Sequence, residues 1–268
     1  MTQQQSLWQF LVSQHEKLFV QIGQHLGLTF LSLLLAIIVG LPFGVLISRR
    51  RKLATSLLGT AGILQTVPSI ALLGFMIPLF GIGATPAIIA LLIYALLPII
   101  RNTYTGITGV DSTIIEAATA LGMNKTQRLF QVEFQLAMPV IIAGIRTAAV
   151  INVGVATLAS FVAAGGLGEF IFGGISLNNT NMILAGAIPA ALLAVLLDLI
   201  IGYLQKSTLK TLRKVLYIIC GILIAGGLYF VFSSNPERKI TAGFTPEFMG
   251  RQDGDLGLRS VYGLQLNP

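Results

Sequence analysis

The sequence predicts an all-α, polytopic membrane protein with about six transmembrane helices. Of its 268 residues, 54% are hydrophobic and only 10% are charged, and the mean hydropathy is +0.84. Soluble domains contain about a quarter charged residues. Apolar segments of about 20 residues, the length that crosses a bilayer as a helix, recur along the chain. The charged residues gather in short clusters between these segments.

The apolar segments divide the chain into an N-terminal segment, a core, a last span and a tail. Residues 1–25 mix apolar and polar residues at helical spacing, so we expect an amphipathic helix on the membrane surface. The core, residues 26–214, contains five spans, residues 215–232 form a sixth, and residues 233–268 form a polar tail. The predicted spans lie near Leu26–Ser48, Leu57–Phe80, Ala87–Ile107, Val140–Ala163, Ile183–Leu204 and Leu216–Phe232.

The connections between the spans predict the orientation of the chain. Lys and Arg residues cluster on one side, at Arg49–Lys52, Lys125/Arg128 and Lys206–Lys214. The short connections on the other side, a tight turn at Gly81–Thr85 and a Gly-rich loop at Gly165–Asn179, contain neither residue type. Because positive charges favour the cytoplasmic side, we expect the N-terminus and the tail to lie outside the cytoplasm.

The longest polar connection, residues 108–139, is predicted to form two short helices joined by a turn. Thr113 followed three residues later by Glu116 matches a capping box, so the first helix should begin near Ile114. Gly122 can adopt the left-handed conformation that ends a helix. The connection therefore carries its own start and stop signals.

The second helix of this connection should begin after Asn124, because Asn124 and Gln127 form a second cap signal. Ala117 and Ala118 give the first helix a small face that permits close approach of another chain. A bent pair of helices with such a face suits a groove in a partner protein. The residues alone equally allow an ordinary cytoplasmic loop in which Glu116 only caps the helix.

Glu116, Ala117, Ala118 and, after three residues, Gly122 resemble the EAA loop of bacterial ABC importer permeases. After nine intervening residues, the family pattern continues with an aliphatic residue, any residue, Leu and Pro. The corresponding positions here are Val132, Glu133, Phe134 and Gln135, and the next Pro is Pro139, so the Leu-Pro pair is absent. The resemblance implies the type I ABC importer permease fold, in which this loop is the coupling helix that docks on an ATPase subunit.

The resemblance to this family implies several partners. ATP and Mg²⁺ would bind a partner ABC ATPase, which agrees with the absence of a GxxxxGK[ST] motif from this sequence. The chain itself is therefore expected to be neither an enzyme nor a cofactor-binding protein. An extracytoplasmic substrate-binding protein or domain would deliver the solute. A second copy of the chain or a paralogous permease would complete the pathway in the bacterial cytoplasmic membrane.

The composition indicates neither nucleic acid nor metal as a partner. The net charge of +7 lies in short clusters without interleaved aromatic residues, which does not fit nucleic-acid binding. His15 and His25 are isolated and are expected at the membrane interface. Cys220, the single cysteine, lies in an apolar run and can form no intrachain disulfide.

The stretch Gln65–Leu72 resembles the matching stretch of permeases for quaternary-ammonium osmoprotectants, and Gly165–Glu169 resembles an external segment of such permeases. Pro68 frees a backbone carbonyl, and Thr66 and Ser69 add hydroxyl groups. Inside a membrane such groups are tolerated only within protein or beside a water-filled path. Thr66, Pro68 and Ser69 are therefore candidates for the translocation pathway, with a simple packing kink as the alternative.

Two charged residues lie inside the predicted spans. Arg146 is about six residues into the fourth span, and Asp198 is about six residues before the end of the fifth. At about 1.5 Å per residue, both lie roughly 9 Å deep on the cytoplasmic side. Charges inside membranes are usually paired or line a path. We expect a buried ion pair, and the alternative is that each side chain reaches the interface separately.

The polar tail, residues 233–268, resembles an internal piece of the osmoprotectant-binding domain that can be fused to permeases of this family. Chains below roughly 40 residues rarely build a stable core without a staple. We therefore expect a remnant of a fused binding domain. The alternative is a disordered terminus with chance similarity.

The resemblance implies an importer for glycine betaine, choline, carnitine or a similar solute. A permease for an amino acid such as methionine is one alternative, because the spans do not separate these solutes. A channel or a structural membrane protein without an ATPase partner is an alternative of another class. The sequence leaves open the solute and the choice between a homodimer and a heterodimer.

Overall fold

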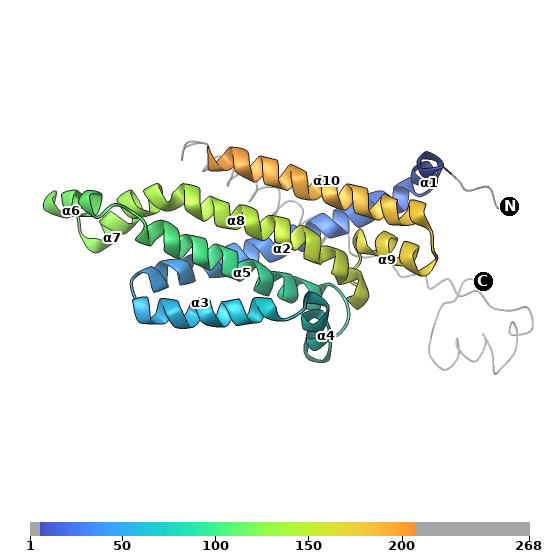
Figure 1. Cartoon of the computed structure of the whole chain (residues 1–268), viewed down its shortest axis with the longest axis horizontal. Coiled ribbons are helices and arrows are strands. Elements are labelled where there is room, and N and C mark those ends of the chain that lie inside the picture. Colours follow the sequence, from blue (N-terminus) through green and yellow to red (C-terminus); the bar gives the residue numbers. More distant parts are fainter. Residues whose placement is uncertain (1–5, 207–268) are drawn as a thin grey trace, which may run out of the picture. The chain divides into compact units, whose positions relative to one another are not determined.

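The computed structural model describes residues 6–206, and within this range the chain is helical almost throughout (Figure 1). In chain order the helices are α1 (Leu7–Ser13), α2 (His15–Ser48), α3 (Arg51–Thr66), α4 (Ser69–Phe80), α5 (Ala84–Thr108), α6 (Ser112–Ala120), α7 (Lys125–Arg128), the π-helix η1 (Leu129–Glu133), α8 (Phe134–Ala156), the 3₁₀-helix η2 (Thr157–Val162), α9 (Gly168–Ser176) and α10 (Thr180–Gln205). The predicted sixth span at 215–232 and the tail at 233–268 lie outside the described residues.

Within the described range, four helical stretches are long and apolar enough to cross a membrane, and one bent pair makes a fifth crossing if its two helices form a single broken span. The four are α2, α5, the continuous stretch from α7 to η2, and α10, and the bent pair is α3 with α4. They follow the order of the five spans predicted for the core. The all-α membrane fold class is confirmed.

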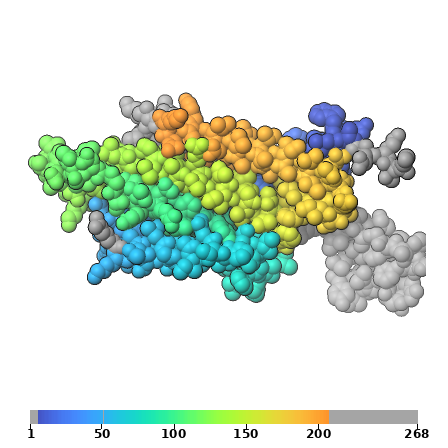
Figure 2. All heavy atoms as spheres, viewed as in Figure 1, coloured from blue at the N-terminus to red at the C-terminus, as the bar shows by residue number. Residues whose placement is uncertain are grey.

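Helix α5 lies at the centre of the packing. It contacts α2 and α8, while α10 packs on α8, and α3 and α4 pack on α5. The long helices run side by side, with α6 and α7 at one end and α1, α4 and α9 at the other (Figure 1). The space-filling view shows α6 and α7 projecting beyond the long helices, where another protein can reach them (Figure 2).

Small residues allow the central helices to approach one another closely. A Cβ added at Gly44 of α2 would lie 2.5 Å from the Cβ of Thr103 of α5. A Cβ added at Gly144 of α8 would lie 2.5 Å from the Cβ of Asn102, also of α5. Contacts of this kind are typical of membrane helices, which associate by close packing instead of by the hydrophobic effect.

The N-terminal region differs from the predicted surface helix over residues 1–25. Helix α2 begins at His15 and continues without a break to Ser48, so residues 15–25 belong to the first spanning helix. The polar side chains of Gln21 and His25 are 2% and 0% exposed. They bond to α9 and α8, so contacts with segments distant in the sequence hold this polar face inside the protein.

The segment Gly165–Asn179 also differs from its prediction as a loop. Helix α9 occupies Gly168–Ser176, and only short turns flank it. Phe170 and Gly174, spaced four residues apart on one face, are both buried. This inward face is what stabilises a helix in a stretch whose glycines suggested a loop.

Candidate functional site

Helix α6 begins two residues earlier than predicted, because Asp111 and not Thr113 caps it. The Asp111 carboxylate accepts a 2.8 Å hydrogen bond from the Thr113 backbone N–H. Hydrogen bonds from the Thr113 backbone and side chain hold the pKa of Asp111 below its ordinary value. Asp is a preferred N-cap residue. Glu116 therefore lies in the second turn, is exposed, and has no capping role, which corrects the predicted capping box.

The end of α6 and the start of α7 agree with their local signals. Gly122 has a φ of +82°, its N–H bonds to the carbonyl of Thr119, and the N–H of Met123 bonds to the carbonyl of Ala118. This is the Schellman arrangement, which ends a helix with a left-handed residue. Asn124 and Gln127 then form a reciprocal capping box with two 2.9 Å bonds.

The outward face of α6 carries a short apolar stripe. Ile114 and Leu121 are 42% and 83% exposed, and Ala117 between them is also exposed. The spacing of three and four residues places them on one face of the helix. Ala118, in contrast, is buried within the chain at 5% exposure. Of the two alanines predicted to meet a partner, only Ala117 is therefore free to do so.

The second predicted span breaks at Pro68, with a 97° bend between α3 and α4. Helix α3 ends at Thr66, Val67 is extended, and α4 begins at Ser69. Thr66 and Pro68 are exposed, and Ser69 is half-buried. The predicted kink is thus a complete break, and it presents polar groups at the surface of this chain.

Tyr94 of α5 stabilises the break from the inside. Its hydroxyl donates a hydrogen bond to the carbonyl of Val67. In return, the side-chain amide of Gln65 donates to the carbonyl of Tyr94 at 2.9 Å. Tyr94 is 7% exposed, and the sequence analysis did not identify it, because its partners lie 27 and 29 residues away.

The structure brings Arg146 of α8 and Asp198 of α10 together. The guanidinium Nε and Nη2 each lie 2.5 Å from one Asp198 oxygen, an arrangement of two parallel bonds. Gly202 leaves room for the guanidinium, since a Cβ there would lie 3.1 Å from Arg146 Cζ. The two side chains are 37% and 36% exposed, so the pair is not fully buried by the described part of the chain.

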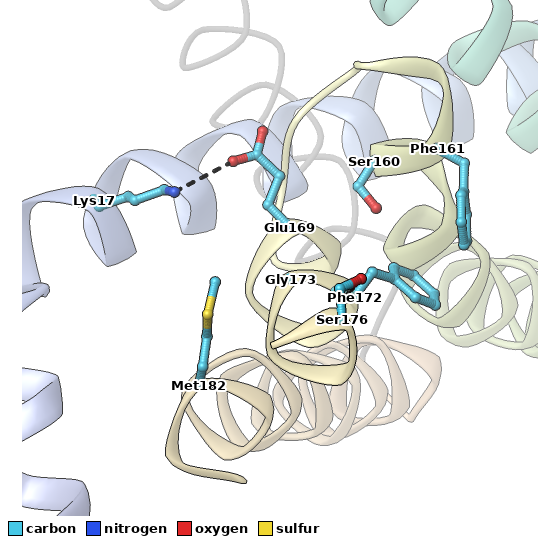
Figure 3. A pocket seen from close by; sticks show the side chains of 8 residues that line it. All are labelled: Lys17, Ser160, Phe161, Glu169, Phe172, Gly173, Ser176 and Met182. Carbon is cyan, nitrogen blue, oxygen red and sulfur yellow. Dashed lines mark hydrogen bonds and ion pairs between the residues drawn. The ribbon is translucent and has the colours of Figure 1, made fainter. Parts of the chain in front are cut away.

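At the end of the bundle opposite α6 and α7, the Gly-rich segment Gly165–Asn179 packs on α2. The Gly166 N–H donates to the side chain of Gln24 at 3.0 Å, and the Gln21 amide donates to Glu169 at 2.6 Å. Lys17 lies 3.8 Å from the same carboxylate, at the edge of a hollow of about 400 Å³ (Figure 3). The segment is therefore held in place by α2 and is not a free turn.

His25, which the sequence analysis expected at the membrane interface, is packed inside the protein. It is fully buried, and its Nε2 lies 3.1 Å from the carbonyl of Val153 on α8. Among the residues that the structure describes, no three His, Cys, Asp or Glu side chains gather as metal ligands.

Comparison with known proteins identifies the family. The model of the family described as "binding-protein-dependent transport system inner membrane component" matches residues 23–210. The chain is 45% identical over 206 residues to the carnitine transport permease protein OpuCB of Listeria monocytogenes, which covers 76% of this chain and 94% of that protein. It is 43% identical over 198 residues to the glycine betaine/carnitine/choline transport system permease protein OpuCB of Bacillus subtilis, covering 74% and 91% of the two chains.

A third relative and a solved structure agree with these matches. The osmoprotectant import permease protein OsmW of Salmonella typhimurium is 49% identical over 187 residues, covering 68% of this chain and 87% of that protein. A chain of the MetNI methionine ABC transporter in an inward-facing conformation has the same fold, with a TM-score of 0.65 and 24% identity, over 70% of this chain and 94% of that one. The chain belongs to the family of inner membrane components of binding-protein-dependent transport systems.

Proposed function

We propose that the chain is the permease subunit of an ATP-driven importer for quaternary-ammonium osmoprotectants such as glycine betaine, choline or carnitine. The observation that carries the solute class is the identity of 43–49% to relatives named for these solutes or for osmoprotectants, over most of both chains. The alternative solute, methionine, rests on the likeness to MetNI, whose 24% identity supports only the fold. A channel without an ATPase is disfavoured by a family whose transport depends on a binding protein.

The ATPase is expected to dock on the apolar stripe of α6 formed by Ile114, Ala117 and Leu121. This stripe is exposed, apolar and carried on a helix that projects beyond the bundle (Figure 2). Exposed apolar surface rimmed by polar groups commonly marks a protein interface. Glu116 is also exposed and would contribute charge to the same contact. ATP and Mg²⁺ would bind the ATPase and not this chain.

The end of the bundle that carries α6 is expected to face the cytoplasm. Arg49 and Arg50 follow α2 at this end, and Lys125 and Arg128 form part of α7. At the other end, Lys17 lies within 3.8 Å of an acidic partner. The distribution supports a multi-pass protein of the bacterial cytoplasmic membrane whose N-terminus lies outside.

The translocation pathway is proposed to run past the break between α3 and α4. Thr66, Pro68 and Ser69 lie at the break, where Thr66 and Pro68 are exposed and Ser69 is half-buried. Such a break is tolerated at membrane depth only beside protein or a water-filled cavity. A second permease subunit, identical or paralogous, would cover this surface and enclose a hydrated path. An extracytoplasmic binding protein would deliver the solute to the end that carries α9.

The test is solute-stimulated ATP hydrolysis by the complex reconstituted in proteoliposomes with its ATPase and binding protein. Glycine betaine, choline, carnitine and methionine would each be supplied outside. We expect a quaternary-ammonium solute to stimulate hydrolysis and to accumulate inside, and methionine to do neither. Stimulation by methionine alone would favour the amino-acid importer. Failure of any ATPase to associate with the chain would favour a channel or structural protein.

A further inference from the structure

A buried carboxylate lies where the α6–α7 connection joins the spanning helix α8. Glu133 is 1% exposed and contacts two cations from different parts of the chain. Arg49 Nη2 lies 2.6 Å from Glu133 Oε2, and Arg128 Nε lies 3.0 Å from Oε1. Arg128 Nη1 also donates a 2.9 Å bond to Thr119 Oγ1. We call these four residues the Glu133 cluster.

The cluster connects four elements: α2, α6, α7 and η1. Arg49 directly follows α2, the first spanning helix, and Glu133 is the last residue of η1. Thr119 lies in α6, the helix that carries the proposed docking stripe, and Arg128 ends α7. A continuous series of side-chain bonds therefore runs from α6 through α7 and η1 to the end of α2.

The π-helix helps to explain why Glu133 points inward. Its N–H to carbonyl bond from Phe134 to Leu129 spans five residues, so the helix contains one residue more than a regular α-helix would. Glu133 then shares the inner face of the helix with Ala137 and Ile141, which are four and eight residues further on and 1% exposed. Glu133 is thus the polar end of a face that is otherwise packed in the core.

The two bonds of Glu133 differ in their surroundings. The Arg128 side chain is 19% exposed, and it joins Glu133 to the neighbouring turns of the same connection. The Arg49 side chain is 39% exposed, and it joins Glu133 to a different spanning helix. Burial of a carboxylate away from water is costly unless charged, hydrogen-bonded partners surround it. The bond to Arg49 therefore connects the α6–α7 connection, which carries the proposed docking stripe, to the first spanning helix α2.

We infer that Glu133, through Arg49, is a positioning residue that transmits displacement of α6 by the docked ATPase to α2. The inference rests on the proposed function, because it requires that an ATPase moves α6. Movement of α6 pulls on Arg128 through Thr119, and Glu133 passes the displacement to Arg49. Without the Arg49 bond, the ATPase still docks and hydrolyses ATP, but the first spanning helix α2 no longer moves with α6.

The test compares Arg49→Gln with Arg50→Gln in the reconstituted complex. Arg50→Gln removes the same charge from the adjacent exposed residue, which is outside the Glu133 cluster. The measured quantity is the number of glycine betaine, choline or carnitine molecules imported per ATP hydrolysed. It is compared between variants at equal amounts of assembled complex. We expect this ratio to fall at least fivefold for Arg49→Gln and to remain within twofold of the original chain for Arg50→Gln. Arg49→Lys, which keeps the charge but offers a single donor group, should recover part of the loss.

A cluster that only stabilises the fold gives a different result. In that case Arg49→Gln lowers the amount of assembled complex, and the surviving complex imports the same number of solute molecules per ATP. That outcome overturns the inference and leaves the proposed function intact. If the unsubstituted complex hydrolyses ATP without any stimulation by these solutes, the proposed function fails and the inference fails with it. In the double variant Arg49→Gln with Glu133→Gln, the loss should be smaller than the sum of the two single losses, because both substitutions remove the Arg49–Glu133 ion pair.

Discussion

Arg146 of α8 and Asp198 of α10 form a bidentate ion pair within the predicted membrane region. Removing one partner leaves an uncompensated charge where water is scarce, and this costs more than removing both. We expect Asp198→Asn to lower assembly or transport severalfold. Arg146→Gln combined with Asp198→Asn should recover part of the loss. Additive losses across this double-mutant cycle would contradict a joint role for the pair.

Orientation is testable by cysteine labelling in a background where Cys220 is replaced by Ser. Thr85 lies at the start of α5, Lys125 lies at the start of α7 at the other end of the bundle, and both are exposed. An impermeant thiol reagent added outside intact cells should modify Thr85→Cys and leave Lys125→Cys unmodified. Detergent permeabilisation is the control, because it should expose both sites. The opposite pattern in intact cells would contradict the proposed orientation.

The start of α6 should depend on pH through Asp111, whose pKa is lowered in the folded chain. Such a group stabilises the folded state above its unfolded pKa, about 3.9 for Asp. This stabilisation disappears as the pH falls through the lower, folded pKa. Hydrogen exchange of the α6 amides, corrected for intrinsic rates, should therefore show more opening at pH 3 than at pH 6.

Asp111→Asn provides the control for this measurement, since Asn caps helices about as well as Asp but does not titrate in this range. Opening of α6 in the Asn variant should be nearly independent of pH. An unchanged pH dependence in that variant would mean that another group is responsible.

The break between α3 and α4 should depend on the hydroxyl of Tyr94. Tyr94→Phe leaves the carbonyl of Val67 without its donor, and an unsatisfied buried polar group typically costs about 1–3 kcal/mol. We expect a lower thermal unfolding midpoint in detergent. Tyr104→Phe on the same helix serves as the comparison, because no hydrogen bond from its hydroxyl is present among the described residues. Equal thermal unfolding midpoints for the two variants would contradict a stabilising role of the Tyr94 hydroxyl at the break.

Local sequence signals predicted the structure where neighbouring residues alone determine it. Gly122 ends α6 in the left-handed conformation, and Asn124 with Gln127 caps α7, both as expected. The start of α6 was mispredicted because two cap residues compete there. Asp111 is the stronger cap and lies only two residues before Thr113.

Local sequence patterns did not predict the contacts between segments that are distant in the sequence. His25 and Gln21 are polar residues on a helix that looks suited to a membrane surface, but α8 and α9 bury them. Glu133 points inward from the π-helix η1, and no residue pattern in the sequence predicts a π-helix there. Tyr94 meets Val67 only because α5 packs on α3 and α4.

Docking of an ATPase on α6 is best tested with variants of the exposed residues of this helix. Ala118 is buried within the chain, so a large residue there would disturb α6 itself. Ala117 lies on the exposed stripe, so Ala117→Glu places a charge in the proposed contact. Because Asp111 caps the helix, Glu116→Gln removes only a charge, and we expect it to weaken ATPase association without unfolding α6. Ser112→Glu, at the exposed first turn, is the matched control, since helix N-termini accept acidic residues.

The most direct measurement is ATP-dependent uptake of glycine betaine, choline or carnitine by complexes that carry Ala117→Glu or Gly122→Val and still insert normally. Gly122 has a positive φ that a β-branched residue disfavours, although no atom lies within 4 Å of an added Cβ. The backbone turn, and not crowding, is therefore what Gly122→Val disturbs. We predict that both variants lose ATP-dependent uptake, that Ala117→Glu no longer co-purifies with the ATPase, and that Ser112→Glu behaves as the original chain. Normal ATP-dependent uptake in both variants would contradict the assignment of α6 as the coupling helix.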